Sequence, residues 1–287
     1  MNPKLILAYF SELFLQFHYS NIDNPSHRKI ATFLNSYLSP KKDVLIKVKG
    51  HNMYASTFDR IIALYLWKFS RLENFETELS KKIVKRSASV IDIGANIGYY
   101  SLIFAKLVGK NGKVYAFEPD PENFRLLVKN ILENKYKNIV PIQKAVTNKS
   151  GKIKLYHSME HRGIHSVYKL RGERKIIEVN TTTLDQFINN KTKLQVIKMD
   201  IEGSECLALS GMKRVIKKNN IIILSEFWPR AIRKCKTSPK GFIEELKSYG
   251  FKINYIDERR REIRPIDYSS LMKICKGGKA ANILLQK

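Results

Sequence analysis

Residues 90–101 read VIDIGANIGYYS, and this stretch decides the fold. Its first four residues, three of which are apolar, are typical of a buried strand. The glycines of GANIG, at 94–98, suit a sharp turn in which the backbone approaches a ligand closely. An amphipathic helical pattern then covers 97–108. A strand, a glycine turn and a helix in this order predict a ligand site at the carboxyl end of a strand in an open α/β sheet.

The rest of the chain extends this pattern from residue 88 to 287. Short apolar runs alternate with amphipathic stretches, which indicates parallel strands connected by helices. We predict strands at 88–93, 113–118, 139–145, 194–200, 220–226, 251–257 and 280–286. Helices are predicted at 97–108, 121–134, 204–217 and 239–249, and a β-hairpin with a loop is predicted within 151–180. We therefore expect a doubly wound, Rossmann-like α/β sheet of seven strands, the last of them antiparallel.

Residues 1–80, which precede this pattern, do not show the alternation of strands and helices. We interpret residues 1–80 as a helical N-terminal extension with one short strand at 43–48, which packs on a domain of residues 81–287 and forms a lid. The apolar stretch at 4–19 is interrupted by Ser11 and Glu12, and a spanning helix needs about 20 residues. We expect no transmembrane segment, while shallow peripheral contact with a membrane stays open.

The composition is globular but strongly basic. Hydrophobic residues make up 44% and charged residues 27%, with 52 Lys and Arg against 26 Asp and Glu, a formal charge of +26. Because the excess is spread along the chain, we interpret it mainly as surface composition and leave nucleic acid or an anionic acceptor open. Cys206, Cys235 and Cys275 are far apart and have no metal-binding spacing, which favours a reduced, cytoplasmic setting.

The glycine turn distinguishes between two classes of ligand. A dinucleotide fingerprint is G-x-G-x-x-G, but here Asn96 takes the middle position and only Gly94 and Gly98 remain. S-adenosylmethionine has no phosphate and carries a sulfonium and an ammonium, so it suits a site with an acid. Asp92 lies just before the turn and is predicted to bind the ammonium side, directly or through water. A dehydrogenase that binds NAD is the weaker alternative.

Three further strand ends carry carboxylates. In VYAFEPDPENF, at 114–124, Glu118 follows the second strand and is placed to accept hydrogen bonds from ribose hydroxyls, which both NAD and S-adenosylmethionine have. In VIKMDIEGSE, at 196–205, Asp200 and Glu202 follow a buried strand, and Glu226 ends the next. Crowded carboxylates require a cation, a metal or a hydroxyl partner, although Asp200 also suits a helix N-cap.

These motifs, taken in order, resemble the FkbM-type methyltransferase family over about residues 75–287. The resemblance is carried by NFETE (74–78), VIDIGANIGYYS, VYAFEPDPENF, NIVPIQKAV (138–146), TTLDQF (182–187), IKMDIEGSE (197–205) and ANILL (281–285). It implies the class I methyltransferase form of the Rossmann-like fold and S-adenosylmethionine as cofactor. At Trp228 many members look to carry histidine, so the acceptor pocket of this chain departs from the family pattern.

The resemblance also implies roles for individual residues. The predicted cofactor-binding residues are Glu76, Asp92, Gly94, Ala95, Asn96, Gly98, Glu118, Pro119, Asn123, Gln143, Ala145 and Asp200. Gln143 and Ala145 would border the adenine, whereas Asp200 and Glu202 would lie between the donor methyl and the acceptor. The candidate general bases are Asp200, Glu202, Glu226 and His161, the last from a loop expected to overhang the site. We expect no bound metal.

The function expected from these residues is methyl transfer to an acceptor oxygen. The family resemblance favours a hydroxyl of a sugar or a natural product, held as a small-molecule or glycan acceptor, and the basic surface suits an anionic one. Two alternatives stay open: a methyltransferase that modifies RNA, and a binding module that keeps the fold without turnover. The acceptor, the base, the pathway and the oligomeric state are not determined at this point.

Overall fold

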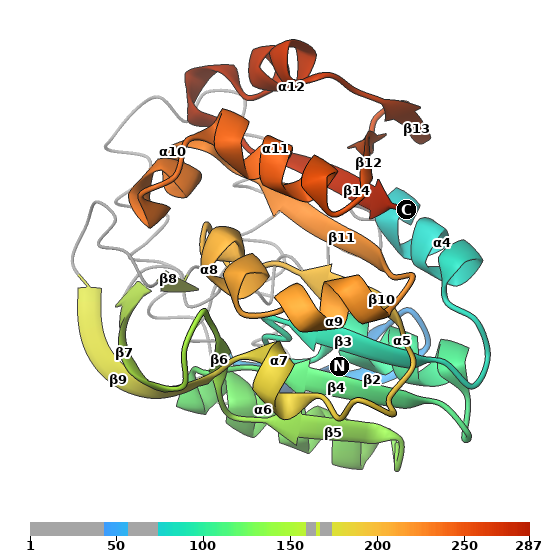
Figure 1. Ribbon diagram of the computed structural model, residues 1–287. Helices are drawn as coiled ribbons and strands as arrows, with labels where there is room; N and C mark the ends of the chain where they lie inside the picture. The colour runs from blue at the N-terminus through green and yellow to red at the C-terminus, as the bar shows by residue number, and fades with distance from the viewer. Residues whose placement is uncertain (1–42, 57–73, 159–164, 167–173) are drawn as a thin grey trace, which may run out of the picture.

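The main body of the protein is a twisted eight-stranded sheet. The computed structural model describes residues 43–56, 74–158, 165–166 and 174–287. The strand order is β13-β12-β14-β11-β10-β3-β4-β5 (Figure 1). The strands are β3 (Ser89–Ile93), β4 (Lys113–Phe117), β5 (Ile139–Ile142), β10 (Leu194–Met199), β11 (Ile222–Phe227), β12 (Lys252–Asp257), β13 (Glu262–Pro265) and β14 (Ala281–Gln286).

The predicted fold class is confirmed, with one difference in strand number. Strands β5, β4, β3, β10 and β11 run parallel, and β14 pairs antiparallel with both β11 and β12, as expected of the last strand. The eighth strand, β13, pairs with the outer edge of β12. Its four residues, EIRP, are largely exposed and end in proline, so they lack the apolar alternation by which the other strands were predicted.

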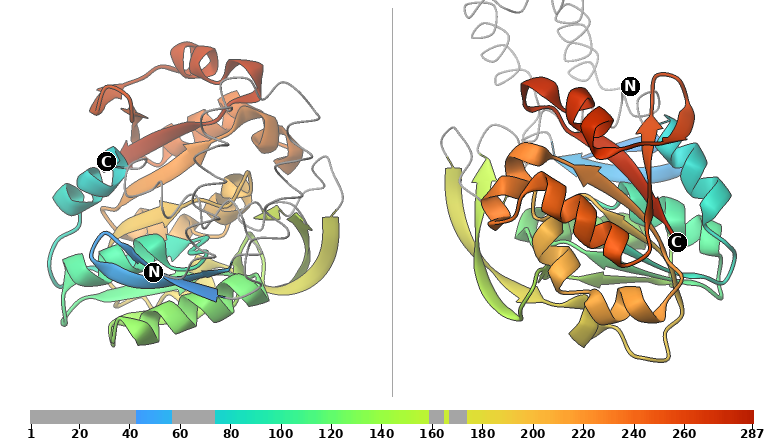
Figure 2. Two further views of the ribbon diagram at one scale, coloured as in Figure 1. Left: turned by 180° about the vertical axis from the view of Figure 1, so that it is seen from behind. Right: turned by 45° about the horizontal axis from the view of Figure 1, so that its top comes forward.

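Helices cover both faces of this sheet, which makes three layers (Figures 1 and 2). On one face lie α8 (Glu205–Ser210), α9 (Lys213–Lys218) and α11 (Pro239–Ser248), and on the other lie α4 (Asn74–Ile83), α5 (Tyr99–Val108) and α6 (Pro121–Glu133). Strand residues alternate between the layers: Ile91 packs towards α8 and α9, whereas Val90 packs towards α5. Short helices complete the chain: α7 (Leu184–Phe187), α10 (Pro229–Ile232), η2 (Arg233–Cys235), α12 (Tyr268–Ile274) and η3 (Lys276–Gly278).

The helix predicted at 204–217 is two helices in the structure. The break falls at Gly211, between α8 and α9. A Cβ atom at this position would lie 2.0 Å from the carbonyl oxygen of Thr147, so the chain bends where the second sheet approaches it. No helix in the described ranges is long and apolar enough to cross a membrane.

The N-terminal part that the structure describes belongs to the same body. The strand predicted at 43–48 is confirmed as β1 (Asp43–Val48), which forms a hairpin with β2 (His51–Ser56). The Asn130 side chain of α6 accepts from the Tyr54 amide (2.6 Å) and donates to the Tyr54 carbonyl (3.0 Å). Phe75 of α4 packs on Leu224 and Leu284 of the sheet. The other parts of the predicted helical extension, residues 1–42 and 57–73, and with them the predicted lid, fall outside the described residues.

A second sheet stands at the carboxyl ends of the main strands. Its order is β6-β9-β7-β8, formed by β6 (Ala145–Val146), β7 (Gly151–Ser158), β8 (His165–Ser166) and β9 (Arg174–Thr182). The hairpin predicted within 151–180 is confirmed as β7 and β9, which curve away from the main sheet (Figure 1). Ala145, Leu155 and Val179 form a small apolar cluster between these strands.

Candidate active site

The GANIG turn joins the ends of three central strands. Gly94, Asn96 and Gly98 have φ angles of 83°, 50° and 99°, a left-handed conformation that glycine adopts at least cost. The Gly94 and Ala95 amides both donate to the Phe117 carbonyl at the end of β4, at 2.9 Å. A Cβ atom on Gly94 would lie 2.0 Å from the Asp200 carbonyl oxygen. This position therefore requires glycine because β10 passes directly against the turn.

A pocket opens above this turn, where the carboxyl ends of β3, β4 and β10 meet the second sheet. It encloses about 600 Å³ of empty space that is open to solvent. The lining residues are Ile93, Gly94, Asn96, Phe117, Glu118, Pro119, Asn123, Lys144, Ala145, Val146, Thr147, Leu155, Asp200, Ile201, Glu202 and Ser204. Two buried atoms of this lining, Asn123 Nδ2 and Ser204 Oγ, have no hydrogen-bond partner within the described part of the chain. A polar ligand would satisfy both of them.

Glu118 follows β4 and faces this pocket with its carboxylate already oriented. Its Oε2 accepts from the Asn96 amide at 2.8 Å, and its Oε1 accepts from the Asp120 amide at 2.9 Å. Burial raises the pKa of Glu118 to about 8, although these two amides act in the opposite direction. Because each carboxylate oxygen accepts two hydrogen bonds, the group retains one free acceptor position on each oxygen.

Asp92 is buried below the turn and does not line the pocket. It accepts a hydrogen bond from Ser101 Oγ at 2.6 Å, and burial raises its pKa to about 6. Asp92 could therefore reach a ligand only through a bridging water or after a shift of its side chain. The other predicted cofactor residues divide clearly. Gly94, Asn96, Glu118, Pro119, Asn123, Ala145 and Asp200 line the pocket, Glu76, Ala95 and Gly98 are buried beside it, and Gln143 is exposed.

A buried lysine links Glu76 to the pocket. Lys198 of β10 is 6% exposed, and its Nζ lies 3.3 Å from Glu76 Oε1 and 3.2 Å from Asp200 Oδ2. Asn282 of β14 donates to Glu76 Oε2 at 3.0 Å. The amides of residues 75 and 76 donate to the carboxylate of Glu258, which holds the start of α4 in place. Sequence reasoning missed Lys198 and Asn282, although a lysine inside an apolar strand is itself a signal of a buried ion pair.

Four carboxyl groups gather where β10 and β11 end. Asp200 and Glu202 line the pocket, and the side chain of Asp200 is 46% exposed. Ser225 pairs with Met199, so Glu226, the last residue but one of β11, lies at the level of Asp200. Glu205, at the start of α8, is fully buried, and its Oε1 accepts from the Ile201 amide. The second oxygens of Glu205 and Glu226 have no hydrogen-bond partner among the described residues.

Burial and repulsion from neighbouring carboxylates keep protons on Glu205 and Glu226. Burial raises the pKa of Glu226 to about 9, and the charges of Asp200, Glu202 and Glu205 add to this effect. Burial also raises the pKa of Glu205 to about 7. In the described part of the chain, no set of three or more His, Cys, Asp or Glu side chains has the arrangement of a metal site. The other candidate base, His161, lies outside the described residues.

These buried carboxyls predict that the ligand-free protein loses stability as the pH rises. The folded-state pKa values of Asp92, Glu118, Glu205 and Glu226 all exceed those of free carboxyls, so the folded state binds more protons than the unfolded state between about pH 4.5 and pH 9. Their contribution is greatest below the unfolded pKa and is lost as the pH passes each folded pKa. We expect the free energy of unfolding to fall steadily from pH 5 to pH 9, since each proton that only the folded state retains changes it by about 1.4 kcal/mol per pH unit.

Urea denaturation of the ligand-free protein at pH 5, 7 and 9 measures this slope. Glu226→Gln should flatten the part between pH 7 and pH 9. A free energy of unfolding that stays constant or rises across this range would show that Asp92, Glu118, Glu205 and Glu226 ionise as they do in the unfolded chain.

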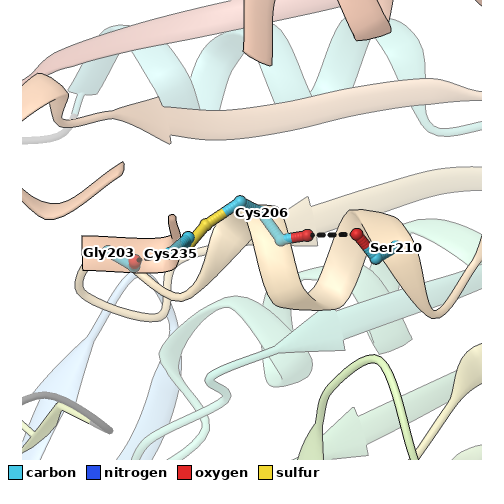
Figure 3. The surroundings of a disulfide bond; sticks show 4 residues. All are labelled: Gly203, Cys206, Ser210 and Cys235. Carbon is cyan, nitrogen blue, oxygen red and sulfur yellow. Dashed lines mark hydrogen bonds between the residues drawn. A yellow bond between two sulfur atoms is a disulfide. The ribbon is translucent and has the colours of Figure 1, made fainter. Parts of the chain in front are cut away.

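A disulfide connects the start of α8, next to the turn that carries Asp200 and Glu202, to the segment after β11. Cys206 of α8 and Cys235 of η2 are bonded, with their Cα atoms 6.4 Å apart (Figure 3). Cys235 Sγ lies 3.6 Å from the Gly203 carbonyl oxygen, and a Cβ on Gly203 would lie 2.0 Å from Ala231 Cβ. The expectation of three reduced cysteines was wrong for this pair. The two residues are 29 positions apart, and only the packing of α10 on the turn brings them together.

The strand order and the pocket define the class of protein. An antiparallel last strand beside β11 and a pocket over the ends of β3, β4 and β10 are the arrangement of a class I methyltransferase domain. The chain belongs to the FkbM methyltransferase family: the model of the methyltransferase FkbM domain matches residues 92–253, more than half of the 287 residues. The methyl donor of this family is S-adenosylmethionine, as predicted.

Two relatives with named activities are similar to this chain. Hexuronic acid methyltransferase AglP of Haloferax volcanii is 27% identical over 190 residues, which cover 64% of this chain and 74% of AglP. The tRNA(Phe) (4-demethylwyosine(37)-C(7)) aminocarboxypropyltransferase of Methanocaldococcus jannaschii is 25% identical over 176 residues, which cover 58% of this chain and 68% of that protein.

Solved structures give more distant matches. Methyltransferase FkbM of Methylobacillus flagellatus is 14% identical, with a TM-score of 0.43, and the alignment covers 81% of this chain and 56% of that chain. A SAM dependent methyltransferase from Aquifex aeolicus is 13% identical, with a TM-score of 0.44, and the alignment covers 79% of this chain and 97% of that chain.

Proposed function

We propose that this protein transfers a methyl group from S-adenosylmethionine to a hydroxyl of a sugar or a natural product, with Asp200 as the general base. One observation carries the proposal: a half-exposed Asp200 carboxylate stands at the edge of the pocket, held by the buried Lys198 at 3.2 Å. The similarity to AglP supports a sugar acceptor, because the name of that relative is hexuronic acid methyltransferase.

The residues of the pocket fit the proposed donor. Glu118 has free acceptor positions for ribose hydroxyls. Asn123 Nδ2 and Ser204 Oγ, which have no hydrogen-bond partner in the described ranges, are available to polar groups of the same ligand. The wall formed by Ala145, Val146 and Leu155 offers apolar surface to an adenine ring. The bound S-adenosylmethionine supplies an electrophilic methyl group on a sulfonium.

The chain itself supplies orientation and a base. Lys198 donates to Oδ2 of Asp200, which leaves Oδ1 to accept the proton that an acceptor hydroxyl loses. Positioning the two reactants in line provides the larger part of the acceleration in such a reaction. Asp200 and Glu202 place negative charge at the pocket edge, so an uncharged hydroxyl is favoured there over an anionic group.

The first test is binding followed by turnover. Calorimetric titration with S-adenosylmethionine, S-adenosylhomocysteine and NAD should show micromolar binding of the two adenosyl ligands only. Methyl transfer from labelled donor to a panel of hexoses, hexuronic acids and hydroxylated natural products then identifies the acceptor class. NAD binding in place of the adenosyl ligands contradicts the proposal, and donor binding without transfer to any acceptor favours a binding module.

Asp200→Asn should then lower the rate of methyl transfer by about 100- to 10,000-fold, the usual contribution of a general base. The affinity for S-adenosylhomocysteine should change far less. Glu244→Gln is the matched control, because it neutralises an exposed carboxyl of α11, and it should keep full activity. Equal rates for Asp200→Asn and the natural sequence would assign the base to another group.

RNA is the second candidate acceptor. The formal charge of +26 and the similarity to the M. jannaschii tRNA aminocarboxypropyltransferase support it. Binding to unmodified tRNA that weakens steeply between 50 and 200 mM salt, together with methyl transfer to that tRNA, would favour this candidate over a sugar.

A further inference from the structure

We propose that Asp200, Glu202, Glu205 and Glu226 form an acidic cluster that distinguishes the cationic methyl donor from its neutral product. The cluster retains a shared proton while the pocket is empty or holds S-adenosylhomocysteine, and releases that proton when the sulfonium binds. This inference rests on the proposed function, because it concerns the same pocket and the same cofactor.

The geometry places the cluster against the reactive end of the pocket. Asp200 and Glu202 belong to the lining, and Glu226, the last residue but one of the neighbouring strand β11, lies at the level of Asp200. Ser204, which lies between Glu202 and Glu205 in the chain, is 4% exposed and lines the pocket with an Oγ that has no partner among the described residues. This hydroxyl is an independent sign that a polar ligand group approaches the cluster.

The cluster carries more acid than its neighbours neutralise. The charged and titratable groups that face Glu226 are Asp200, Glu202, Glu205, Lys198 and the buried Cys275 thiol. Lys198 already lies between the carboxylates of Glu76 and Asp200. Among the described residues, its positive charge is therefore largely offset before Glu205 and Glu226 are counted. The second oxygens of Glu205 and Glu226 are buried and have no hydrogen-bond partner within the described ranges.

Such an arrangement cannot ionise completely on its own. Burial and like charges raise the pKa of Glu226 to about 9 and, mainly through burial, that of Glu205 to about 7, so at neutral pH the cluster holds at least part of one proton. A positive charge placed beside Asp200 and Glu202 lowers the cost of ionising the remaining carboxyls. The sulfonium of the donor is such a charge. S-adenosylhomocysteine differs only by the lost methyl group and this charge, so a comparison of the two ligands isolates the effect.

Linkage fixes the direction of the effect. A ligand that releases protons on binding gains affinity as the pH rises, by up to tenfold per pH unit for each proton released. The affinity for the donor relative to the product should therefore increase with pH. At a given pH the cluster also disfavours the neutral product relative to the donor, which assists their exchange after each turnover.

The test measures protons and affinity rather than activity. Each ligand is titrated into the full chain by calorimetry at pH 7.5 in phosphate and in Tris buffer, whose ionisation enthalpies differ, so that the slope gives the protons released. We expect the donor to release about 0.3 to 1 proton more than S-adenosylhomocysteine. The affinity ratio of donor to product should rise about three- to tenfold between pH 6.5 and pH 8.5. Titration of the amino groups of the ligands is the same for every variant and cancels in comparisons between variants.

Matched variants assign the effect to the cluster. Glu226→Gln keeps the shape of the protonated side chain and should abolish most of the difference in proton release, and Glu205→Gln should reduce it. Glu244→Gln on α11 should leave it unchanged. Equal proton release by both ligands in the natural sequence, or a full difference that persists in both cluster variants, overturns the inference while leaving the proposed methyltransferase intact. If neither adenosyl ligand binds, the proposed function fails and the inference with it.

Discussion

Replacing Glu118 by alanine is expected to weaken the binding of S-adenosylmethionine and S-adenosylhomocysteine by about 100-fold. The change removes a buried acceptor predicted to bind two ribose hydroxyls, and hydrogen bonds to charged groups contribute roughly 1.5–3 kcal/mol each. It also leaves the Asn96 and Asp120 amides without their present partner. Calorimetric titration of both ligands measures the loss.

Two further variants separate recognition from general disturbance. Glu118→Gln keeps the volume of the side chain but only one acceptor oxygen, and its NH2 group would face one of the two backbone amide donors. We expect an intermediate loss of about tenfold. Glu122→Ala, in the first turn of α6 and exposed, should bind both ligands as the natural sequence does. Unchanged affinity in Glu118→Ala would show that the ribose is held elsewhere, and the predicted orientation of the cofactor would be wrong.

Gly94→Ala is expected to have the largest effect on stability, a loss of about 3–5 kcal/mol in the free energy of unfolding. Two costs add: a left-handed backbone conformation, worth roughly 1–2 kcal/mol for a residue with a Cβ, and displacement of β10, because the new Cβ would lie 2.0 Å from the Asp200 carbonyl oxygen. Chemical denaturation with circular dichroism measures the difference.

Gly250→Ala is the matched control for this substitution. Gly250 has a φ of +86°, close to the +83° of Gly94, and a Cβ there would meet nothing within 4 Å. It should therefore lose only the backbone contribution of roughly 1–2 kcal/mol. If the two variants lose equal stability, β10 gives way to the new methyl group without cost, and the turn is less tightly held than the contacts indicate.

Much of the fold could be predicted because the buried strands carry a physical signal. The residues of β3 and β10 are almost all buried, so each appears as a mainly apolar stretch next to a polar turn. Strand β13 lacks this signal because it is an exposed edge strand. The break between α8 and α9 depends on the approach of Thr147 to Gly211, a contact between distant residues that no local pattern contains.

The residues of the candidate site also fall into those that the sequence predicts and those that only the structure reveals. Asn96, Glu118 and Asp200 could be predicted as pocket residues because each follows a strand whose end must face the ligand crevice. Gln143 was expected at the pocket from the family motif, yet it is exposed, and the following residues Lys144 and Ala145 line the pocket instead. The partners of Glu76 and the Cys206–Cys235 bond depend on the tertiary packing of separate elements, which spacing along the chain does not reveal.

The hydrogen bonds of α4 have a consequence for how the chain acquires its active form. Glu76 lies before the first central strand, yet it is held by Asn282, 206 residues later, and its amide by Glu258, 182 residues later. During synthesis, β3, β4 and β10 leave the ribosome first, so the adenosine side of the pocket forms from residues already available. Glu76, which pairs with Lys198, gains its Asn282 partner only when the last strand emerges. Contacts of such long range also slow folding, so the strands that line the pocket are available before the Glu76 side of this ion pair is fixed.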